Sequence, residues 1–248
     1  MAKLIFDIET IGENFDELDE TTQGALSWWI KKESNGEEEY KIALEELKNG
    51  LGFSPLTGQV VAIGVLDGDS EPSSMASYGA GKNKGAVYYQ NPDDLTEESE
   101  DGGIKFKAMS ERDMLAKFWE LAEHYDEFVS FNGRSFDVPF LMIRSAILGV
   151  RPSVDLMSNR YLSSQRFGAK HIDLLDQLSF YGAVRRKGNL HLWSRAFGIK
   201  SPKEGGVTGE DVGQLFREKK FLDIAKYNVG DLRATLALYN YWDKYLKF

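Results

Sequence analysis

Two acidic side chains, Asp7 and Glu9, stand one residue apart after the apolar run Leu4-Ile5-Phe6, with Ile8 between them. Side chains alternate between the faces of a strand, so these two carboxylates are expected on the same face. Two half-buried carboxylates repel each other unless a positive charge lies between them, and a divalent metal ion would supply it. The alternative is that the strand ends here and both acids are solvated. The pair alone leaves both interpretations open.

A third acid, Asp137, follows the predicted strand 127–131 after the short loop Asn132-Gly133-Arg134-Ser135. In an α/β sheet, ligands bind at the carboxyl ends of the strands. Asp137 would therefore lie at the same edge as Asp7 and Glu9. A local role is the alternative, because an Asp in the first helical turn after a Ser cap stabilises the helix dipole.

The last predicted helix contributes a fourth acid. Tyr227 and Asp231 are four residues apart, so they lie on one flank of this helix, between its core stripe and its solvent stripe. Asp231 is thus directed toward other parts of the protein. It is either a further metal ligand with a tyrosine beside it, or a carboxylate that bonds the tyrosine hydroxyl and anchors the helix.

Strands alternate with helices along most of the chain. The hydrophobic periodicity predicts further strands at 59–66, 86–90 and 171–175. It predicts one helix at 37–48, a second that begins at Ser110 and a third that follows residues 132–135 and ends near Gly149. Further helices are predicted near 190–197 and from Val212 to the end. This alternation is typical of an α/β fold with a largely parallel sheet. Residues 13–57 are acidic and irregular outside the one helix, and 93–103 reads as an exposed acidic loop.

The composition excludes several classes of site. The chain has 248 residues and no cysteine, which rules out disulfides, thiolate zinc sites and cysteine nucleophiles. Its three histidines, His124, His171 and His191, lack a metal-ligand spacing. The net charge of −9 argues against a broad basic surface for duplex DNA. No segment reads as a membrane span or a signal peptide, so we expect a cytoplasmic protein without a membrane partner.

Three stretches in order carry a resemblance to a known group. Phe6-Asp7-Ile8-Glu9-Thr10, Asn132-Gly133-Arg134-Ser135-Phe136-Asp137 and Tyr227-Asn228-Val229-Gly230-Asp231 resemble the three motifs of the DEDD superfamily of 3′–5′ exonucleases, in the tyrosine subtype found in proofreading domains of family B DNA polymerases. Three further segments resemble other parts of the same family more weakly: 58–66, 171–175 and 203–209. We expect no polymerase domain, so the chain resembles stand-alone exonucleases.

The resemblance implies an RNase H-like fold, with a mixed sheet flanked by helices, and a single exonuclease domain over residues 1–248 with an acidic insertion at 13–57. It implies that two divalent cations, Mg²⁺ or Mn²⁺, are held by Asp7, Glu9, Asp137 and Asp231, with Asp7 bridging them. Tyr227 would orient the attacking water. The 3′-terminal nucleotide would contact Thr10, Asn132 and Phe136.

The implied reaction is metal-dependent hydrolysis of phosphodiester bonds at the 3′ ends of single-stranded DNA, which releases nucleoside 5′-monophosphates. Three alternatives stay open. The chain could be an exoribonuclease on the same fold, since nothing in the sequence reads the 2′-hydroxyl of RNA. It could also be a non-catalytic nucleic-acid-binding or protein-binding module on an exonuclease scaffold, or each acid could have only a local structural role.

Overall fold

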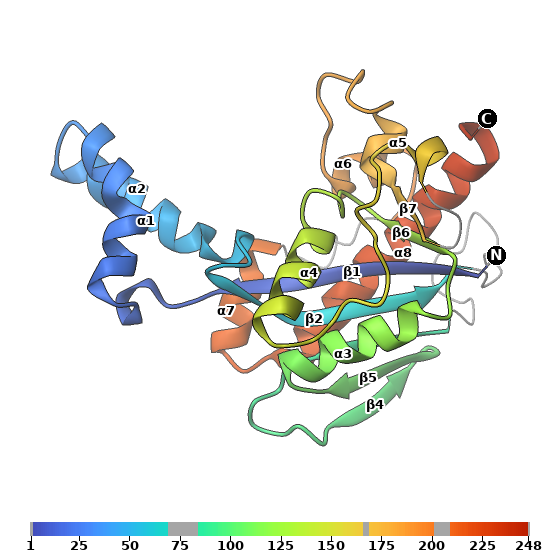
Figure 1. Cartoon of the computed structure of the whole chain (residues 1–248), viewed down its shortest axis with the longest axis horizontal. Helices are drawn as coiled ribbons and strands as arrows, with labels where there is room; N and C mark the ends of the chain where they lie inside the picture. The colour runs from blue at the N-terminus through green and yellow to red at the C-terminus, as the bar shows by residue number, and fades with distance from the viewer. Residues whose placement is uncertain (1, 69–83, 166–168, 201–208, 248) are drawn as a thin grey trace.

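A seven-stranded mixed sheet lies at the centre of the computed structural model, which describes residues 2–68, 84–165, 169–200 and 209–247 (Figure 1). The strands are β1 (Lys3–Gly12), β2 (Gly58–Asp67), β3 (Gly85–Tyr89), β4 (Glu98–Asp101), β5 (Ile104–Ala108), β6 (Glu127–Ser130) and β7 (Lys170–Asp173). Their order in the sheet is β4-β5-β3-β2-β1-β6-β7. β1 pairs antiparallel with β2 and parallel with β6, and β6 pairs parallel with β7. The expected mixed sheet is confirmed, whereas a largely parallel sheet is wrong because β2 pairs antiparallel with both of its neighbours.

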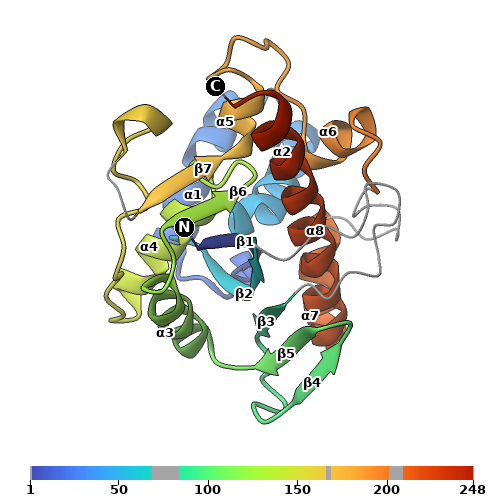
Figure 2. The ribbon, with the colours of Figure 1, turned by 90° about the vertical axis from the view of Figure 1, so that its right-hand side faces the viewer.

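Helices cover both faces of the sheet (Figure 2). They are α1 (Glu20–Glu33), α2 (Glu37–Gly50), α3 (Glu111–Ala122), α4 (Asp137–Ile147), α5 (Leu174–Leu178), α6 (Leu190–Ala196), α7 (Val212–Arg217) and α8 (Phe221–Tyr245). The 3₁₀ turns are η1 (Phe15–Glu17), η2 (Leu51–Phe53), η3 (Leu162–Ser164) and η5 (Gly209–Asp211). α3 and α4 pack on one face of the central strands, and α8 packs on the other.

The central strand β1 is buried on both sides, as its sequence predicts. Leu4, Phe6 and Ile8 belong to the core under α3 and α4. Ile5 belongs to the core under α8. Because side chains alternate along a strand, Asp7 and Glu9 share the face of Ile5 and are directed toward α8. The alternation of side chains along β1 therefore decides that the two acids face α8 and not α3 or α4.

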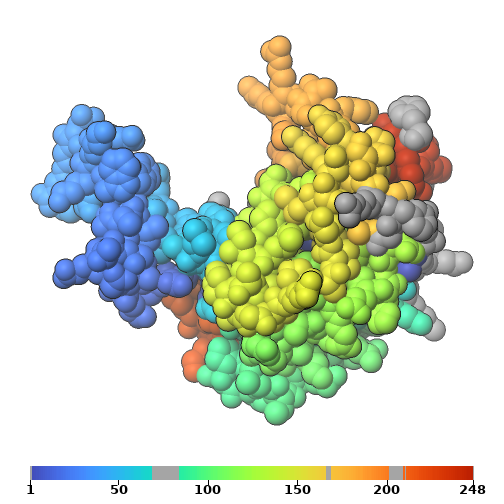
Figure 3. All heavy atoms as spheres, in the orientation of Figure 1, coloured from blue at the N-terminus to red at the C-terminus, as the bar shows by residue number. Residues whose placement is uncertain are grey.

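A helical arm, α1 and α2, projects from the body beside the left end of β1 in Figure 1, and Figure 3 shows the open space between this arm and the body. The helix predicted at 37–48 is confirmed as α2. α1 was missed in residues expected to be irregular, because few apolar positions mark it. Its start is fixed by Asp19, whose carboxylate accepts hydrogen bonds from the backbone N–H groups of Thr21 and Thr22.

Three further expectations about local structure are corrected. β1 does not end at the acids but continues to Gly12, paired with β2. The predicted strand 171–175 stops at Asp173, because this residue caps α5 by accepting from the N–H groups of Leu175 and Asp176. Part of the expected loop 93–103 is β4, which pairs with β5 while its side chains stay exposed.

Other strands and helices follow the prediction more closely. Strands 59–66, 86–90 and 127–131 are confirmed as β2, β3 and β6, and Ser110 caps α3 as expected. The companion segment 203–209 lies outside the described residues, except for Gly209. Within the described part of the chain, no helix combines the length and the apolarity needed to cross a membrane.

A buried ion pair joins the helices of one face to β2. Glu111, in the first turn of α3, accepts hydrogen bonds from the backbone N–H of Val60 (2.8 Å) and from Nε (2.9 Å) and Nη2 (2.7 Å) of Arg144 on α4. Glu111 is 9% exposed. One carboxylate thus ties α3, α4 and β2 together.

We predict that Glu111→Ala lowers the free energy of unfolding by about 3 kcal/mol, because it leaves Arg144 and the Val60 N–H without this buried partner. Urea denaturation measures the change. The control is Glu120→Ala on the same helix, which removes an exposed ion pair with Lys117 and is expected to cost less than about 1 kcal/mol. Equal losses for both variants would contradict the role of the buried pair.

Candidate metal centre

Asp7 and Glu9 lie where the sheet opens beside β1. The parallel pairing with β6 ends at Ile5, which faces Val129, whereas the pairing with β2 continues to Gly12. The two acids therefore stand just beyond the carboxyl end of the parallel neighbour. This is the edge at which open α/β sheets bind ligands.

α8 brings a third carboxylate to this pair. Each of Asp7, Glu9 and Asp231 offers a carboxylate oxygen, and these oxygens all lie within 4.8 Å of one another. Burial raises the pKa of Asp7 and of Glu9 well above the usual values, and neighbouring carboxylates raise both further. Closely spaced carboxylate oxygens are the ligands that Mg²⁺ and Mn²⁺ prefer, so the donor set fits a divalent cation.

Asp137 is not one of this trio, but it approaches the same part of β1 from α4. It is the first residue of α4, it is 3% exposed, and its Oδ1 accepts a hydrogen bond from the backbone N–H of Ile8 (3.1 Å). Burial raises its pKa to about 7, against the lowering effect of its backbone hydrogen bonds, and the charges of Asp173 and Asp231 add to the increase. Asp137 is thus bonded to the residue between Asp7 and Glu9, which a purely local role in α4 does not require.

Tyr227 lies one helical turn before Asp231 and is partly buried. Burial raises the pKa of its hydroxyl far above the usual value, and the carboxylates of Asp231, Glu9 and Asp7 raise it further. The phenol is therefore protonated at neutral pH. It can donate a hydrogen bond toward the acids, but it cannot act there as a base.

Sequence reasoning missed Asn228, which lies between the acids. Its Nδ2 donates to Oδ2 of Asp7 (2.8 Å) and is 3.4 Å from Oε1 of Glu9. Asn228 is completely buried, and its Oδ1 has no hydrogen-bond partner among the described residues. The room for this amide comes from Gly64 of β2, where an added Cβ would stand 1.7 Å from Oδ1. The available signals were a polar residue next to Tyr227 and a glycine inside an apolar strand.

Sequence reasoning also missed what Asp173 does. Its Oδ1 accepts from the backbone N–H of Asn132 (3.0 Å), and its Oδ2 accepts from that of Arg134 (3.0 Å). Asn132 adopts a left-handed backbone with φ of 64°, which asparagine tolerates better than most residues. A buried carboxylate at the end of β7 therefore fixes the loop that leads from β6 to Asp137.

The residues predicted to contact substrate lie around η2 and this loop. Thr10 Oγ1 donates to the carbonyl oxygen of Gly52 (2.7 Å). The Phe136 ring packs against Phe140 at 5.5 Å between centroids and meets the exposed Phe53 ring at 6.4 Å. Asn132 begins the same loop. Residues 52 and 53, near the end of the acidic segment 13–57, thus border the candidate centre, which the sequence did not indicate.

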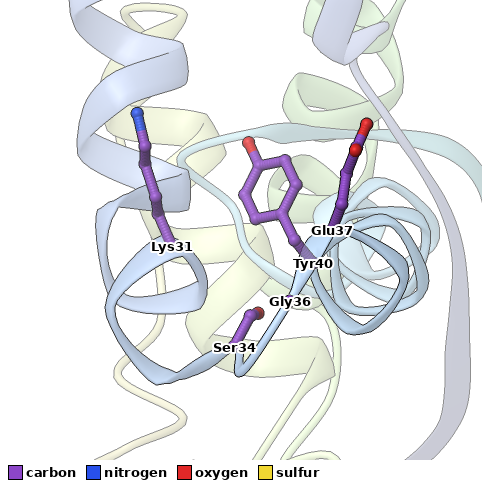
Figure 4. A pocket seen from close by; sticks show the side chains of 5 residues that line it. All are labelled: Lys31, Ser34, Gly36, Glu37 and Tyr40. Carbon is purple, nitrogen blue, oxygen red and sulfur yellow. The ribbon is translucent and has the colours of Figure 1, made fainter.

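A separate hollow of about 300 Å³ lies in the helical arm, lined by Lys31, Ser34, Gly36, Glu37 and Tyr40 (Figure 4). Its lining comes from the end of α1, the start of α2 and the turn between them. It offers a single carboxylate, so it does not provide a second acidic metal centre.

We predict that the metal-free protein loses stability as the pH rises from about 4, the usual Asp pKa, to about 7, the folded-state pKa of Asp137. In this window the folded state binds more protons than the unfolded chain, so the free energy of unfolding falls with pH. Asp7→Asn removes one repelling charge and is expected to raise Tm at pH 8 by about 2–4 °C, the change for 1 kcal/mol in a chain of this size. Melting curves in EDTA measure both effects. If the metal-free Asp7→Asn variant melts well below wild type, the acid is a structural element instead.

We also predict strong coupling between Gly64 and Asn228. Gly64→Ala alone destabilises the protein, because the new methyl group and the amide cannot share the space. In the Asn228→Ala background the same substitution costs much less, since the amide is gone. A double-mutant cycle by urea denaturation measures a coupling of about 1–3 kcal/mol. Additive losses would show that the amide is not held against the glycine.

DNA polymerases are among the curated relatives of this chain. The protein from Desulfurococcus sp. (strain Tok) is 27% identical over 147 residues, which is 52% of this chain and 18% of that protein. The protein from Thermococcus gorgonarius is also 27% identical over 147 residues, which is 52% of this chain and 18% of that protein. This chain therefore matches less than a fifth of the length of these relatives.

A solved structure shows the same fold. The family B DNA polymerase from the hyperthermophilic archaeon Pyrobaculum calidifontis superposes with a TM-score of 0.55 over 97% of this chain and 24% of that chain, at 18% identity. The RNase H-like fold expected from the three motifs is thereby confirmed.

One family model matches residues 96–245, and its description is a predicted 3′–5′ exonuclease related to the exonuclease domain of PolB. The match contains Asp137, Tyr227 and Asp231, whereas Asp7 and Glu9 precede it. It covers more than half of the chain. The chain belongs to this family of predicted 3′–5′ exonucleases related to the exonuclease domain of PolB.

Proposed function

We propose that this protein is a metal-dependent 3′–5′ exonuclease that hydrolyses the terminal phosphodiester bond of single-stranded DNA and releases nucleoside 5′-monophosphates. Membership of the exonuclease family supports the nuclease activity. The names of the curated relatives, DNA polymerases, support DNA as the substrate.

The observation that carries the proposal is the trio of carboxylates from β1 and α8. Asp7, Glu9 and Asp231 place their oxygens within 4.8 Å of one another, with Glu9 buried and the other two partly buried. A module that only binds nucleic acid has no use for this repulsion, because it would weaken both the fold and the affinity for phosphate. Two divalent ions, Mg²⁺ or Mn²⁺, would balance the charge.

We assign Asp7, Glu9 and Asp231 as metal ligands, with Asp137 as a further ligand on the opposite side of β1. Divalent ions held by these residues would lower the pKa of a coordinated water and offset the negative charge on the phosphate. Asp137 is positioned for this role by its bond to the Ile8 N–H, and Asp7 by its bond to Asn228. Both bonds orient a carboxylate without adding a competing positive charge.

Tyr227 is assigned to orient the attacking water. Its hydroxyl stays protonated because burial and the neighbouring carboxylates raise its pKa, so it positions the water and does not deprotonate it. Attack of water on the terminal phosphorus breaks the bond to O3′ of the preceding nucleotide. The products are then a nucleoside 5′-monophosphate and a shortened strand with a free 3′-hydroxyl.

Contacts to the 3′-terminal nucleotide are assigned to Thr10, Asn132 and Phe136. The Phe136 ring has the exposed Phe53 ring beside it, and the two faces offer apolar surface for a base. Thr10 joins β1 to η2 through Gly52, so it lies between the acids and this aromatic pair.

We predict that the wild-type protein shortens a 5′-labelled single-stranded DNA stepwise in Mg²⁺ or Mn²⁺. Asp7→Ala and Asp231→Ala should lower the rate at least about 100-fold, and Tyr227→Phe by about tenfold to 100-fold, because each removes a group that acts on the transition state. Gel electrophoresis of the digestion products measures the rates, and Glu120→Ala, which changes an exposed acid on α3, is the control.

The same assay separates the alternatives. Faster shortening of an RNA oligonucleotide than of DNA would identify an exoribonuclease. No ladder on either substrate, or digestion by Asp7→Ala at the wild-type rate, would refute the proposed activity. Calorimetric titration with Mn²⁺ tests the non-catalytic alternative, which predicts no tight binding of the ion.

A further inference from the structure

We propose that the loop between α5 and α6, together with Tyr161, binds the single strand upstream of the 3′-terminal nucleotide. The residues of this surface, here called the basic strip, are Tyr161, Phe180, Arg185, Arg186 and Lys187. The inference rests on the proposed exonuclease function and adds a binding surface for the part of the strand that is not being cut. In Figure 1 the loop projects from the body above α5 and α6.

The charge of the chain is divided unevenly between two projections. Residues 13–57, which contain the helical arm, hold 11 acidic and four basic residues, so their net charge of −7 accounts for most of the −9 of the whole chain. The opposite charge stands in the loop, where Arg185, Arg186 and Lys187 follow one another and are all exposed. Within the ranges that the structure describes, none of these three forms an ion pair. A phosphate backbone is repelled by residues 13–57 and attracted by the loop.

The basic strip also holds two exposed aromatic rings. Phe180 is 53% exposed and Tyr161 is 56% exposed. The Tyr161 ring packs on the Tyr181 ring at 4.9 Å between centroids. Exposed aromatic rings interleaved with basic residues are the features with which proteins bind single strands without reading their sequence, because every base offers a face for stacking.

The backbone holds Phe180 in place in a conformation that bulky residues rarely adopt. Phe180 and Tyr181 have φ of 50° and 55°. Such strain persists only when the surroundings fix it, and it is concentrated at functional sites. Here the N–H of Tyr181 donates to the carbonyl of Asp176 (2.7 Å), and the Tyr181 hydroxyl accepts from the N–H of Leu162 (3.1 Å). The exposed phenyl ring is thus presented by a fixed turn.

Hydrogen bonds and an ion pair join the segments that border the basic strip to the loop that carries Asp137. Arg134 of that loop donates to the carbonyl oxygens of Leu156 (3.2 Å) and Met157 (3.3 Å). Arg160, which follows Met157 along the chain, forms a bidentate ion pair with Asp176 of α5. Both connections converge near Asp173, which starts α5 and also holds the Asp137 loop. The strip therefore begins at the same sheet edge as the metal centre.

The experiment measures binding without cleavage. Fluorescence anisotropy of a 5′-labelled single-stranded 20-mer in EDTA gives Kd at several salt concentrations. The triple variant Arg185→Gln/Arg186→Gln/Lys187→Gln should weaken binding at least about tenfold. It should also lower the slope of log K against log salt by about 2, since each phosphate contact contributes about 0.7 on a single strand.

Two further variants make the result specific. Lys105→Gln/Lys107→Gln/Arg112→Gln removes three exposed charges on β5 and α3 and should leave the affinity within about twofold of wild type. Phe180→Ala should weaken binding about tenfold with an unchanged salt slope, because stacking involves no charge. Equal affinities and slopes for wild type and the loop variants, or an equal loss in the control triple variant, would overturn the proposal.

Cleavage then separates this inference from the proposed function. If the basic strip binds the upstream strand, the ratio of kcat/KM on the 20-mer to kcat/KM on a dinucleotide falls in the loop triple variant. An equal fall on both substrates would assign the loop a structural role and overturn the inference. A wild-type protein that binds the strand but cuts neither substrate would instead refute the exonuclease function.

Discussion

Repulsion between closely spaced, buried or partly buried carboxylates is the constraint around which this structure is organised. Asp7, Glu9 and Asp231 come from β1 and α8, which are 222 residues apart along the chain at Glu9 and Asp231, and their oxygens lie within 4.8 Å. Burial raises the pKa of Asp7 and of Glu9, and neighbouring carboxylates raise both further, so the fold must hold these groups together against their mutual repulsion. It does so with apolar packing on both faces of β1 and with an amide, Asn228, that bonds the acids without neutralising them. A centre held this way is prepared to bind cations.

The loop from Asn132 to Asp137 is also held in place by buried polar groups. Asp173 satisfies the backbone N–H groups of Asn132 and Arg134, and Asp137 satisfies the N–H of Ile8 on the open side of β1. Each of these carboxylates replaces a strand partner that the sheet no longer supplies beyond β6 and β7. The loop is therefore fixed by hydrogen bonds to carboxylates, and its geometry does not depend on side-chain packing alone.

The distribution of charge outside the centre gives the two projections different roles. Residues 13–57, which include the helical arm, carry most of the net negative charge, and η2 at the end of this segment places Phe53 beside Phe136. The loop after α5 carries three consecutive basic residues and an exposed phenyl ring. An overall charge of −9 is thus compatible with a nucleic-acid substrate, because the acids and bases are segregated.

The sequence by itself determined much of this protein. The order of strands and helices, the two-sided burial of β1 and the three motifs with Asp7, Glu9, Asp137, Tyr227 and Asp231 follow from local periodicity and spacing, which a sequence displays directly. The grouping of the acids at one edge followed from a general rule about sheets. Only the tertiary structure decided the antiparallel partners of β2, the extension of β1 to Gly12 and the roles of Asn228, Gly64 and Asp173. These depend on contacts between residues far apart in the chain, such as the room that Gly64 leaves for Asn228, and no local pattern encodes such a contact.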